Sequence, residues 1–581
     1  MINFNRFLFV LLFLLLFLCL TFCLLWPVFS SHSIIIPYTI KPFDICESFP
    51  TAWLYLKILY IVLLIHSLLI WANRFYSNLP QYFKAPIVTS SPINPQTPNG
   101  LSLYVGDISD TNSKVYIPEK GLYQNILITG TIGSGKTSSS MYPFTKQLIE
   151  YNHSSNKDRI GMLILDVKGS YYIQVQSYVS EFNRHNDFIV IELGGKTKYN
   201  PLDKPNLKPI VLANRLKTIL TLFSPNTSDS YWLDKAEQVL AEAIKLCRLY
   251  NNNYVTFVEL HKLINIDDYY KEKLSILRKN FHSGKMSHED IYNLSSSINF
   301  FESEFLQLDS RVLSIIKSEI TRITNTFISD FDVLNTFCPS KSEVTFEGFK
   351  EVINASKIVL LNMNISQYKN LSKIIATYLK LDFQSEILSQ LATPEASPNV
   401  TAFICDEYHE YVTDTDAEFF AQSREARSIN IVATQSYTSL LNSLKNEPAV
   451  KVIIQNLINK LWFQTGDSFT IEDVQKQIGK EDKSKISKSI SENANETHFN
   501  YFTNSLNSKK SNVSESISTY TQTDFVYDTK FFTQSLETFT CLSFISDGYK
   551  IMTPTKIKMF PVFNPQNGTL NINHKKNYKI I

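Results

Sequence analysis

The sequence has almost no net charge and no closely paired cysteines. Its 56 basic residues nearly balance 54 acidic ones, which leaves a formal net charge of +2. With no global basic field, any contact with nucleic acid must use a local patch or a channel. The seven cysteines include no Cys-x-x-Cys pair, which excludes a disulfide framework and a zinc site of ordinary spacing. The bulk of the chain therefore fits a reducing, cytosolic environment.

The chain has no internal repeat, and its composition is not that of a disordered protein. Of its 581 residues, 44% are hydrophobic and 13% are aromatic, which is enough apolar material to build real cores. The length predicts three or four domains.

Two long apolar runs, at about residues 7–28 and 53–72, lie near the N-terminus. The first carries no charge and the second carries one lysine, and each can cross ~30 Å of hydrocarbon as a helix. Arg6 before the first run and Arg74 after the second place both flanks in the cytoplasm by the positive-inside rule. We therefore expect residues 1–75 to form a membrane anchor with two transmembrane helices. A cleaved signal peptide is the alternative for the first run.

The body of the chain has the pattern of an α/β fold. A linker rich in proline, serine and asparagine ends near residue 100, and short apolar runs bounded by turn residues follow it. Such runs predict buried parallel strands, and helical patterns separate them. The predicted strands lie in residues 125–130, 161–170, 187–195, 356–363, 399–407 and 429–436.

Three segments depart from this alternation. Residues 203–340 combine cap signals with helical spacing, which predicts an inserted all-α domain. Residues 76–202 and 341–581 would then form one nucleotide-binding domain. Within it, residues 480–523 are rich in Lys, Ser and Asn without apolar periodicity, so we expect an exposed loop or a weakly ordered excursion. Asp547–Gly548 lies between two β-rich runs and predicts a hairpin.

The clearest chemical signal is GTIGSGKT, which matches the pattern G-x-x-x-x-G-K-[ST]. In such a loop the backbone N–H groups turn towards phosphate oxygens, and the lysine places its charge on the β- and γ-phosphates. The threonine hydroxyl coordinates Mg²⁺. A strand pattern before the loop and a helix pattern after it support this interpretation. The sequence therefore predicts binding of ATP and Mg²⁺ by Gly130, Thr131, Ile132, Gly133, Ser134, Gly135, Lys136, Thr137 and Ser138.

An acidic pair provides the matching carboxylates. Asp406 ends an apolar strand and is predicted to hold the Mg²⁺ together with Thr137. Glu407 points elsewhere, where it can orient and polarise the attacking water. An acidic pair can also simply end a surface strand, but the phosphate loop upstream favours catalysis. We interpret the nearby His409 and Glu410 as solvated helix positions.

Three further polar residues follow the acidic pair. Gln435 ends another apolar strand, and strand C-terminal ends line the ligand crevice of a parallel sheet. It can therefore sense the γ-phosphate or the water, or it can be satisfied by nearby backbone. Arg424 and Arg427 lie between the two strands. One of them, preferably Arg424, is a candidate arginine finger offered to a neighbouring subunit, although an arginine on a helix is usually only solvated.

The ordered set of motifs, behind a two-helix anchor, resembles the type IV coupling proteins. These are membrane ATPases that link conjugative DNA processing to a type IV secretion channel. The resemblance covers most of residues 125–467 and the anchor, and it rests on GTIGSGKT, LILDVKGSYY, YNPL, YWLDKAE, FICDEYHEY, SREARSINIVATQS and NLINKLWFQTGD. It implies a RecA-like P-loop domain with an inserted all-α domain, a ring of six identical subunits, and a location in the bacterial inner membrane.

The resemblance also implies roles for individual residues. Lys136, Thr137, Asp406, Glu407, Gln435 and Arg424 match the functional positions of the family. Asp166 and Lys168 match its Asp-x-Lys-Gly segment, where Val167 and Ser170 depart from the usual residues. We therefore interpret that segment as structural support for the site.

The predicted function is ATP-driven transfer of single-stranded DNA with relaxase-type protein cargo, or of protein alone, into a type IV secretion channel. A chromosome-partition DNA pump or a secretion-assembly ATPase is the alternative enzyme. A scaffold that binds ATP without turnover is the non-enzymatic alternative, which the intact acidic pair disfavours. An ABC transporter is disfavoured because no LSGGQ-like signature occurs.

Overall fold

The computed structural model describes Thr51, Tyr55, Ile58 and residues 100–563, apart from several short gaps. The predicted linker and nearly all of the predicted membrane anchor lie outside these residues. In the part of the chain that is described, no helix has both the length and the apolar character needed to span a membrane. The gaps are residues 156–157, 167–168, 224–229, 283, 285, 364, 393–397, 493–496, 501–504 and 509–512.

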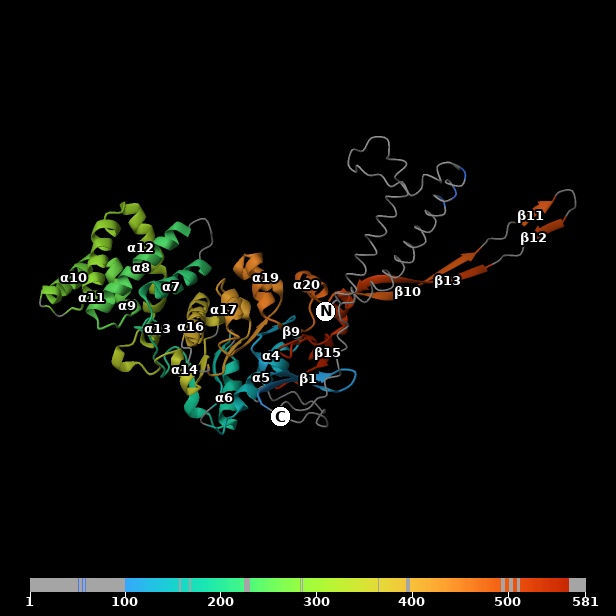
Figure 1. The fold of residues 1–581 in the computed structure, drawn as a ribbon, viewed down its shortest axis with the longest axis horizontal. Coiled ribbons are helices and arrows are strands. Elements are labelled where there is room, and N and C mark those ends of the chain that lie inside the picture. Colours follow the sequence, from blue (N-terminus) through green and yellow to red (C-terminus); the bar gives the residue numbers. More distant parts are fainter. Residues whose placement is uncertain are drawn as a thin grey trace, which may run out of the picture. The chain divides into compact units, whose positions relative to one another are not determined.

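One eleven-stranded sheet organises the body, in the order β2-β1-β15-β14-β9-β3-β8-β7-β4-β6-β5 (Figure 1). The strands from β9 to β5 pair in parallel and form the parallel half of the sheet. All but β5 are buried at every position, as expected for strands covered on both faces. All six predicted strands are confirmed, and β9 is an addition. The bounds are β9 (Asn459–Trp462), β3 (Ile126–Thr129), β8 (Ser428–Thr434), β7 (Thr401–Cys405), β4 (Gly161–Leu165), β6 (Ile358–Leu361) and β5 (Phe188–Ile191).

The other four strands pair antiparallel and form the antiparallel half of the sheet. They join the parallel half where β14 pairs with β9. The predicted hairpin at Asp547–Gly548 is confirmed, because it connects β14 to β15 and the N–H of Asp547 donates to the carbonyl of Lys550. The strands are β14 (Thr540–Phe544), β15 (Thr555–Lys558), β1 (Ser102–Ile108) and β2 (Lys114–Pro118).

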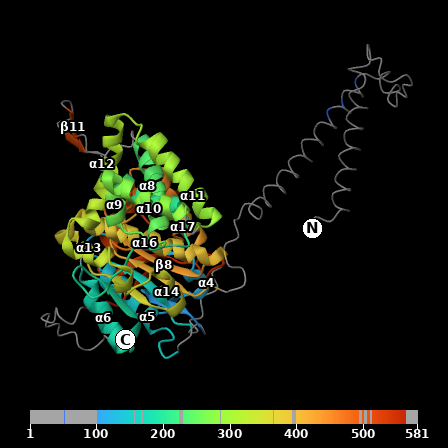
Figure 2. The ribbon, with the colours of Figure 1, turned by 90° about the vertical axis from the view of Figure 1, so that its left-hand side faces the viewer.

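Helices cover both faces of the sheet. Along β3, Ile126 and Ile128 pack into one hydrophobic cluster and Leu127 packs into the other, as alternation along a strand requires. The first cluster includes α5 (Tyr142–Glu150) and α6 (Tyr171–Glu181). The second includes α14 (Phe349–Ala355), α16 (Asn370–Ser389), α17 (Asp416–Gln422), α18 (Tyr437–Leu444) and α19 (Glu447–Asn456). Figure 2 shows β8 between α16 and α17 on one side and α5 and α6 on the other.

Every described element between β5 and β6 is helical. This agrees with the helical character predicted for residues 203–340, while the division of the chain into domains stays a prediction. The principal helices are α7 (Pro209–Phe223), α8 (Ser230–Tyr250), α9 (Phe257–Asn265), α10 (Asp267–His282), α11 (His288–Asn299), α12 (Ser310–Ile328) and α13 (Phe331–Phe337).

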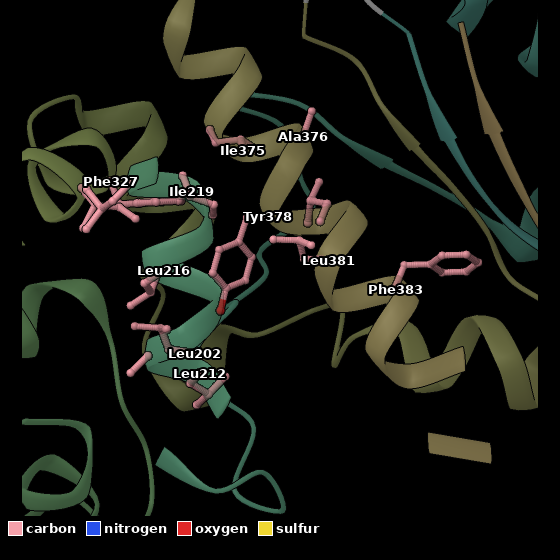
Figure 3. Close-up of a cluster of buried hydrophobic side chains, with 14 of the residues drawn as sticks. Leu202, Leu212, Leu216, Ile219, Phe327, Ile375, Ala376, Tyr378, Leu381 and Phe383 are labelled. Carbon is pink, nitrogen blue, oxygen red and sulfur yellow. The ribbon is translucent and has the colours of Figure 1, made fainter. Parts of the chain in front are cut away.

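Helix α16 connects these helices to the sheet. Leu212, Leu216 and Ile219 of α7 lie towards Tyr378 of α16 in a shared hydrophobic cluster (Figure 3). A buried polar contact joins the same two helices: Asp382 of α16 pairs with Arg215 of α7 at 2.7 Å and with Lys204 at 3.0 Å. The helical segment is therefore joined to the α/β body through α16 by both apolar and ionic contacts.

The prediction of an exposed loop or weakly ordered excursion at residues 480–523 is confirmed for exposure and wrong for secondary structure. After α20 (Ser468–Ile478), β10 (Lys480–Glu492) and β13 (Val513–Phe525) pair antiparallel over their full length. A second short antiparallel pair, β11 (Thr497–Asn500) and β12 (Ser505–Ser508), lies between β10 and β13 in the chain (Figure 1). Backbone hydrogen bonds hold this ribbon, and its described side chains are largely exposed. Since neither face is buried in a core, the sequence shows no apolar alternation to reveal the strands.

Short helical turns complete the described elements. They are α4 (Glu119–Leu122), η1 (Thr137–Met141), η2 (His185–Asp187), η4 (Phe300–Phe305), η5 (Lys341–Glu343), α15 (Ile365–Tyr368), η6 (Gln390–Ala392), η7 (Tyr408–Glu410) and η8 (Phe531–Ser535).

Candidate active site

The sheet brings three of the predicted motifs to one edge. Strand β3 pairs in parallel with β8, with Thr129 opposite Thr434, and β8 pairs in parallel with β7. All three strands therefore end on the same side of the sheet. The phosphate loop follows β3, the acidic pair follows β7, and Gln435 follows β8, which lies between them. This edge is where open parallel sheets bind their ligands.

The phosphate loop has the backbone that its sequence predicts. Gly133 and Gly135 have φ values of +82° and +97°, a left-handed conformation that glycine adopts without steric cost. The Lys136 ammonium lies over the loop and donates to the carbonyl of Gly130 at 2.5 Å and of Thr131 at 3.1 Å. The loop and its lysine therefore form a compact cradle suited to phosphate.

The remaining loop residues differ in exposure. Ile132 is 82% exposed at the tip of the loop. Ser134 is buried, and its hydroxyl donates to the carbonyl of Thr131 at 2.8 Å. The hydroxyl of Ser138 donates to the carbonyl of Gly135 at 3.3 Å. The side chains of Ser134 and Ser138 thus stabilise the loop, and that of Ile132 is exposed. Phosphate binding is therefore expected from the backbone N–H groups and Lys136.

The predicted magnesium ligands contact each other. Thr137 opens the helix after the loop, whose first turn, η1, is π-helical, and its hydroxyl donates to Asp406 Oδ2 at 2.9 Å. A hydroxyl and a carboxylate are hard oxygen ligands, and Mg²⁺ usually takes one or two protein ligands together with substrate phosphates. Among the described residues no group of three or more His, Cys, Asp or Glu could hold a metal alone. The donor set therefore fits a Mg²⁺ shared with a bound nucleotide.

Glu407 is held in an unusual conformation. Its φ and ψ of 49° and 47° are left-handed, which is uncommon for a residue other than glycine and is often associated with function. Its own N–H donates to Asp406 Oδ1 at 3.0 Å, and the residue is 8% exposed. The left-handed turn and this hydrogen bond fix the backbone of Glu407 directly beside Asp406.

The interpretation of His409 and Glu410 as solvated helix positions is wrong. Both lie in η7, where the side chain of His409 is only 14% exposed and Glu410 forms an ion pair with Lys373. His409 Nδ1 lies 3.8 Å from Glu407 Oε2 and 3.3 Å from the hydroxyl of Thr434. Burial lowers the pKa of His409, and the Glu407 carboxylate opposes that effect. His409 therefore links the acidic pair to the end of β8, which a single turn without periodicity could not reveal.

A buried ionic cluster lies behind the acidic pair. Lys380 of α16 donates to both carboxylate oxygens of Asp416, and neither side chain is exposed. The hydroxyl of Tyr408 and the N–H of Thr413 also donate to Asp416, at 2.5 and 3.0 Å. Burial lowers the pKa of Lys380, and Asp416 opposes that effect. The cluster anchors the turn that carries Glu407 to α16.

Gln435 and the two arginines lie at opposite ends of β8. Gln435 follows the strand at the phosphate-loop edge, whereas Arg424 and Arg427 precede it. Arg427 pairs with Glu119 of its own chain at 2.8 Å, and its Nε donates to the Tyr123 hydroxyl at 3.2 Å. Arg424 is exposed. Both arginines precede β8, at the end of the strand away from the phosphate loop, and Arg424 is the more exposed of the two.

The Asp-x-Lys-Gly segment has a structural contact at its first position. Asp166 follows β4 and is 3% exposed, and its carboxylate accepts the backbone N–H of Tyr171, the first residue of α6, at 2.9 Å. This agrees with the interpretation as structural support. Lys168 lies outside the described residues.

Two solved structures of coupling proteins share the fold of this chain. The bacterial conjugative coupling protein TrwBdeltaN70 aligns with a TM-score of 0.52 and 11% identity, covering 79% of this chain and 89% of that one. Plasmid coupling protein TrwB in complex with ADP and Mg²⁺ aligns with a TM-score of 0.50 and 12% identity, over 79% and 91% of the two chains. VirB4 of Thermoanaerobacter pseudethanolicus has a TM-score of 0.45 and 13% identity, over 80% and 98%.

Sequence comparison identifies the family. No curated protein matches the chain. The family model for the type IV secretion-system coupling protein DNA-binding domain matches residues 111–517, which span the phosphate loop, the helical segment, the acidic pair and most of the β-ribbon. This mixed α/β chain therefore belongs to the type IV secretion-system coupling protein family.

Proposed function

We propose that this protein is a membrane-anchored ATPase that recruits DNA with bound protein and drives it into a type IV secretion channel. The observation that carries the proposal is the contact between Thr137 and Asp406 at the carboxyl edge of the parallel sheet, 2.9 Å long. Lys136 lies over the loop beside this contact, and Glu407 follows Asp406 in a left-handed turn. These are the parts that hydrolysis of a nucleoside triphosphate requires.

Each side chain has a separate task in this proposal. The loop N–H groups and Lys136 hold the phosphates, and Thr137 and Asp406 hold Mg²⁺, which supplies positive charge to the phosphate oxygens. Glu407 orients a water for attack. Gln435, which follows β8 at the same edge of the sheet, senses whether the γ-phosphate is present. His409 holds Glu407 in position from the side of β8.

Nucleotide binding is supported by the relatives. TrwB has been solved in complex with ADP and Mg²⁺ and with a non-hydrolysable ATP analogue. We propose that this chain takes the same substrate and cofactor, ATP and Mg²⁺. The structure of the loop and the hard oxygen donors of Thr137 and Asp406 fit them.

We further propose a homohexameric ring in the bacterial inner membrane. The apolar runs at about residues 7–28 and 53–72 would anchor the ring, with both termini and the ATPase body in the cytoplasm. Arg424 would reach the phosphate site of the next subunit. Single-stranded DNA with relaxase-type protein would pass through the ring to the channel, where a few basic residues repeated six times give sufficient local charge.

DNA transfer between cells tests whether hydrolysis is the function. A strain that lacks the gene would receive either the wild-type gene or the Glu407→Gln variant, and expression would be matched by immunoblot. We expect the variant to reduce the transfer frequency by about 10²–10⁴-fold, because a positioned general base contributes roughly that factor. Transfer at the wild-type frequency would instead indicate a docking scaffold that binds ATP without turnover.

A further inference from the structure

Two aromatic side chains from the antiparallel half of the sheet lie beside the phosphate loop. Phe539 immediately precedes β14, and Phe563 lies shortly after β15. Their ring centroids are 6.1 Å apart and the ring planes are 79° apart, an edge-to-face arrangement. Phe563 is 56% exposed. A pair of this kind presents an open aromatic face next to a nucleotide site.

Backbone hydrogen bonds fix both aromatic segments to the loop. The N–H of Phe539 donates to the carbonyl of Ser134 at 3.1 Å, and its own carbonyl accepts the N–H of Met559 at 2.8 Å. The N–H of Val562, next to Phe563, donates to the carbonyl of Ser138 at 2.8 Å. The middle of the phosphate loop, at Ser134, and its last residue, Ser138, are thus each bonded to one of the aromatic segments.

Phe539 takes a conformation that favours this contact. Its φ of +64° is left-handed, which is rare for a bulky residue and is retained only where its surroundings enforce it. A Cβ added at Gly135 would lie 2.4 Å from a ring carbon of Phe539. The ring of Phe539 therefore packs directly on the loop, in space that only glycine leaves open.

The direction of a bound nucleotide follows from the order of the strands. Strands β8 and β7, which carry Gln435 and the acidic pair, lie on one side of β3, and β9 and β14 lie on the other. Lys136 and the acidic pair define the β- and γ-phosphate end of the site. The nucleoside is attached to the opposite end of the triphosphate, at the α-phosphate. The aromatic segments lie on the side of β3 away from the acidic pair.

We propose that Phe563 stacks on the base of the bound nucleotide and that Phe539 holds the ring of Phe563 in place. This inference rests on the nucleotide site proposed above and deepens it by assigning the base a platform in the antiparallel half of the sheet. Stacking uses the π-face that every base has, so the platform recognises a nucleobase as a class.

Isothermal titration calorimetry on the full-length chain in detergent tests the platform. MgADP and magnesium tripolyphosphate are the two probes, since only the first carries a base. The variants are Phe563→Ala, Phe563→Tyr, which keeps an aromatic face, and Phe560→Ala as a matched control. Phe560 lies in the same segment, but its ring stacks on Tyr104 of β1, with the centroids 6.4 Å apart.

We expect Phe563→Ala to weaken MgADP about tenfold, which is within the range of base–aromatic stacking, and to leave tripolyphosphate unchanged. Phe563→Tyr and Phe560→Ala should bind both probes as the wild type does. Wild-type affinity of Phe563→Ala for MgADP, or an equal loss for both probes, would overturn the platform alone. A wild-type chain that binds no MgADP would overturn the proposed ATPase and the platform with it.

Discussion

The two halves of the sheet contribute differently to the candidate site. The parallel half supplies every residue proposed to act on the phosphates or the water, from the ends of β3, β7 and β8. The antiparallel half supplies none of these, but it places Phe539 and Val562 in hydrogen bonds with the phosphate loop. The difference indicates that chemistry and recognition of the nucleoside are separated on either side of β3. Substitutions in the two halves should therefore change different quantities.

The largest effect is expected at Arg424, in the parallel half. Alanine at this position should lower ATP turnover by about 10³-fold or more in the assembled ring, because an arginine finger contributes roughly 10³–10⁵. Affinity for MgADP should change little, because an arginine finger acts on the transferred γ-phosphoryl group, which ADP lacks. Steady-state turnover and calorimetry on the same preparation measure the two quantities.

Arg427→Ala is the control for that variant. Arg427 pairs with Glu119 within its own chain, so its loss should affect local packing and leave turnover within a few-fold of the wild type. If only Arg427→Ala loses turnover, Arg427 and not Arg424 is the arginine finger. Loss of MgADP affinity in Arg424→Ala would contradict a role for this residue that is confined to the γ-phosphoryl group.

A smaller effect, on stability and not on catalysis, is expected at the junction of the two halves. Lys460 of β9 lies opposite Phe544 of β14 and is 2% exposed. Burial lowers the pKa of Lys460 to about 8, and Asp473 opposes that effect. The unfolded chain, with a lysine pKa of about 10.4, then binds the proton more tightly than the folded chain. Lys460 therefore destabilises the fold below pH 8, and this cost disappears as the pH rises to about 10.5.

Lys460→Met tests this junction, because methionine keeps the length of the side chain and removes the charge. At pH 7 the free energy of unfolding of the variant should exceed that of the wild type by about 3 kcal/mol. The difference should shrink between pH 8 and pH 10.5 as the wild-type lysine loses its proton. Denaturant titrations of both proteins across that range measure it. A difference that stays constant with pH would show that Lys460 is not buried as a charge.

The sequence predicts six of the seven parallel strands and the hairpin between β14 and β15, but it does not reveal β9 or the β-ribbon, for physical reasons. Strands buried on both faces are uninterrupted apolar runs, and the phosphate loop has a fixed spacing. Strand β9 was missed because the buried Asn459 and Lys460 interrupt its apolar pattern. The β-ribbon was missed because strands exposed on both faces need no apolar alternation.

The supporting contacts of the site depend on distances in space that no local pattern encodes. Asp416 meets Lys380 from a different helix, and His409 meets Thr434 from the neighbouring strand. Phe539 reaches the phosphate loop from a segment about 400 residues later in the chain. A motif therefore identifies which residues perform the chemistry, while the residues that hold them in position emerge only from the fold.

ATP turnover by the full-length chain in detergent, with and without single-stranded DNA, tests the central claim most directly. The Lys136→Ala variant is the blank, because the lysine charge on the phosphates is lost while the loop glycines remain. We predict turnover that single-stranded DNA stimulates several-fold and that is absent from the variant under both conditions. Turnover that is indifferent to DNA, or that persists in Lys136→Ala, would contradict a DNA-transfer ATPase built on this site.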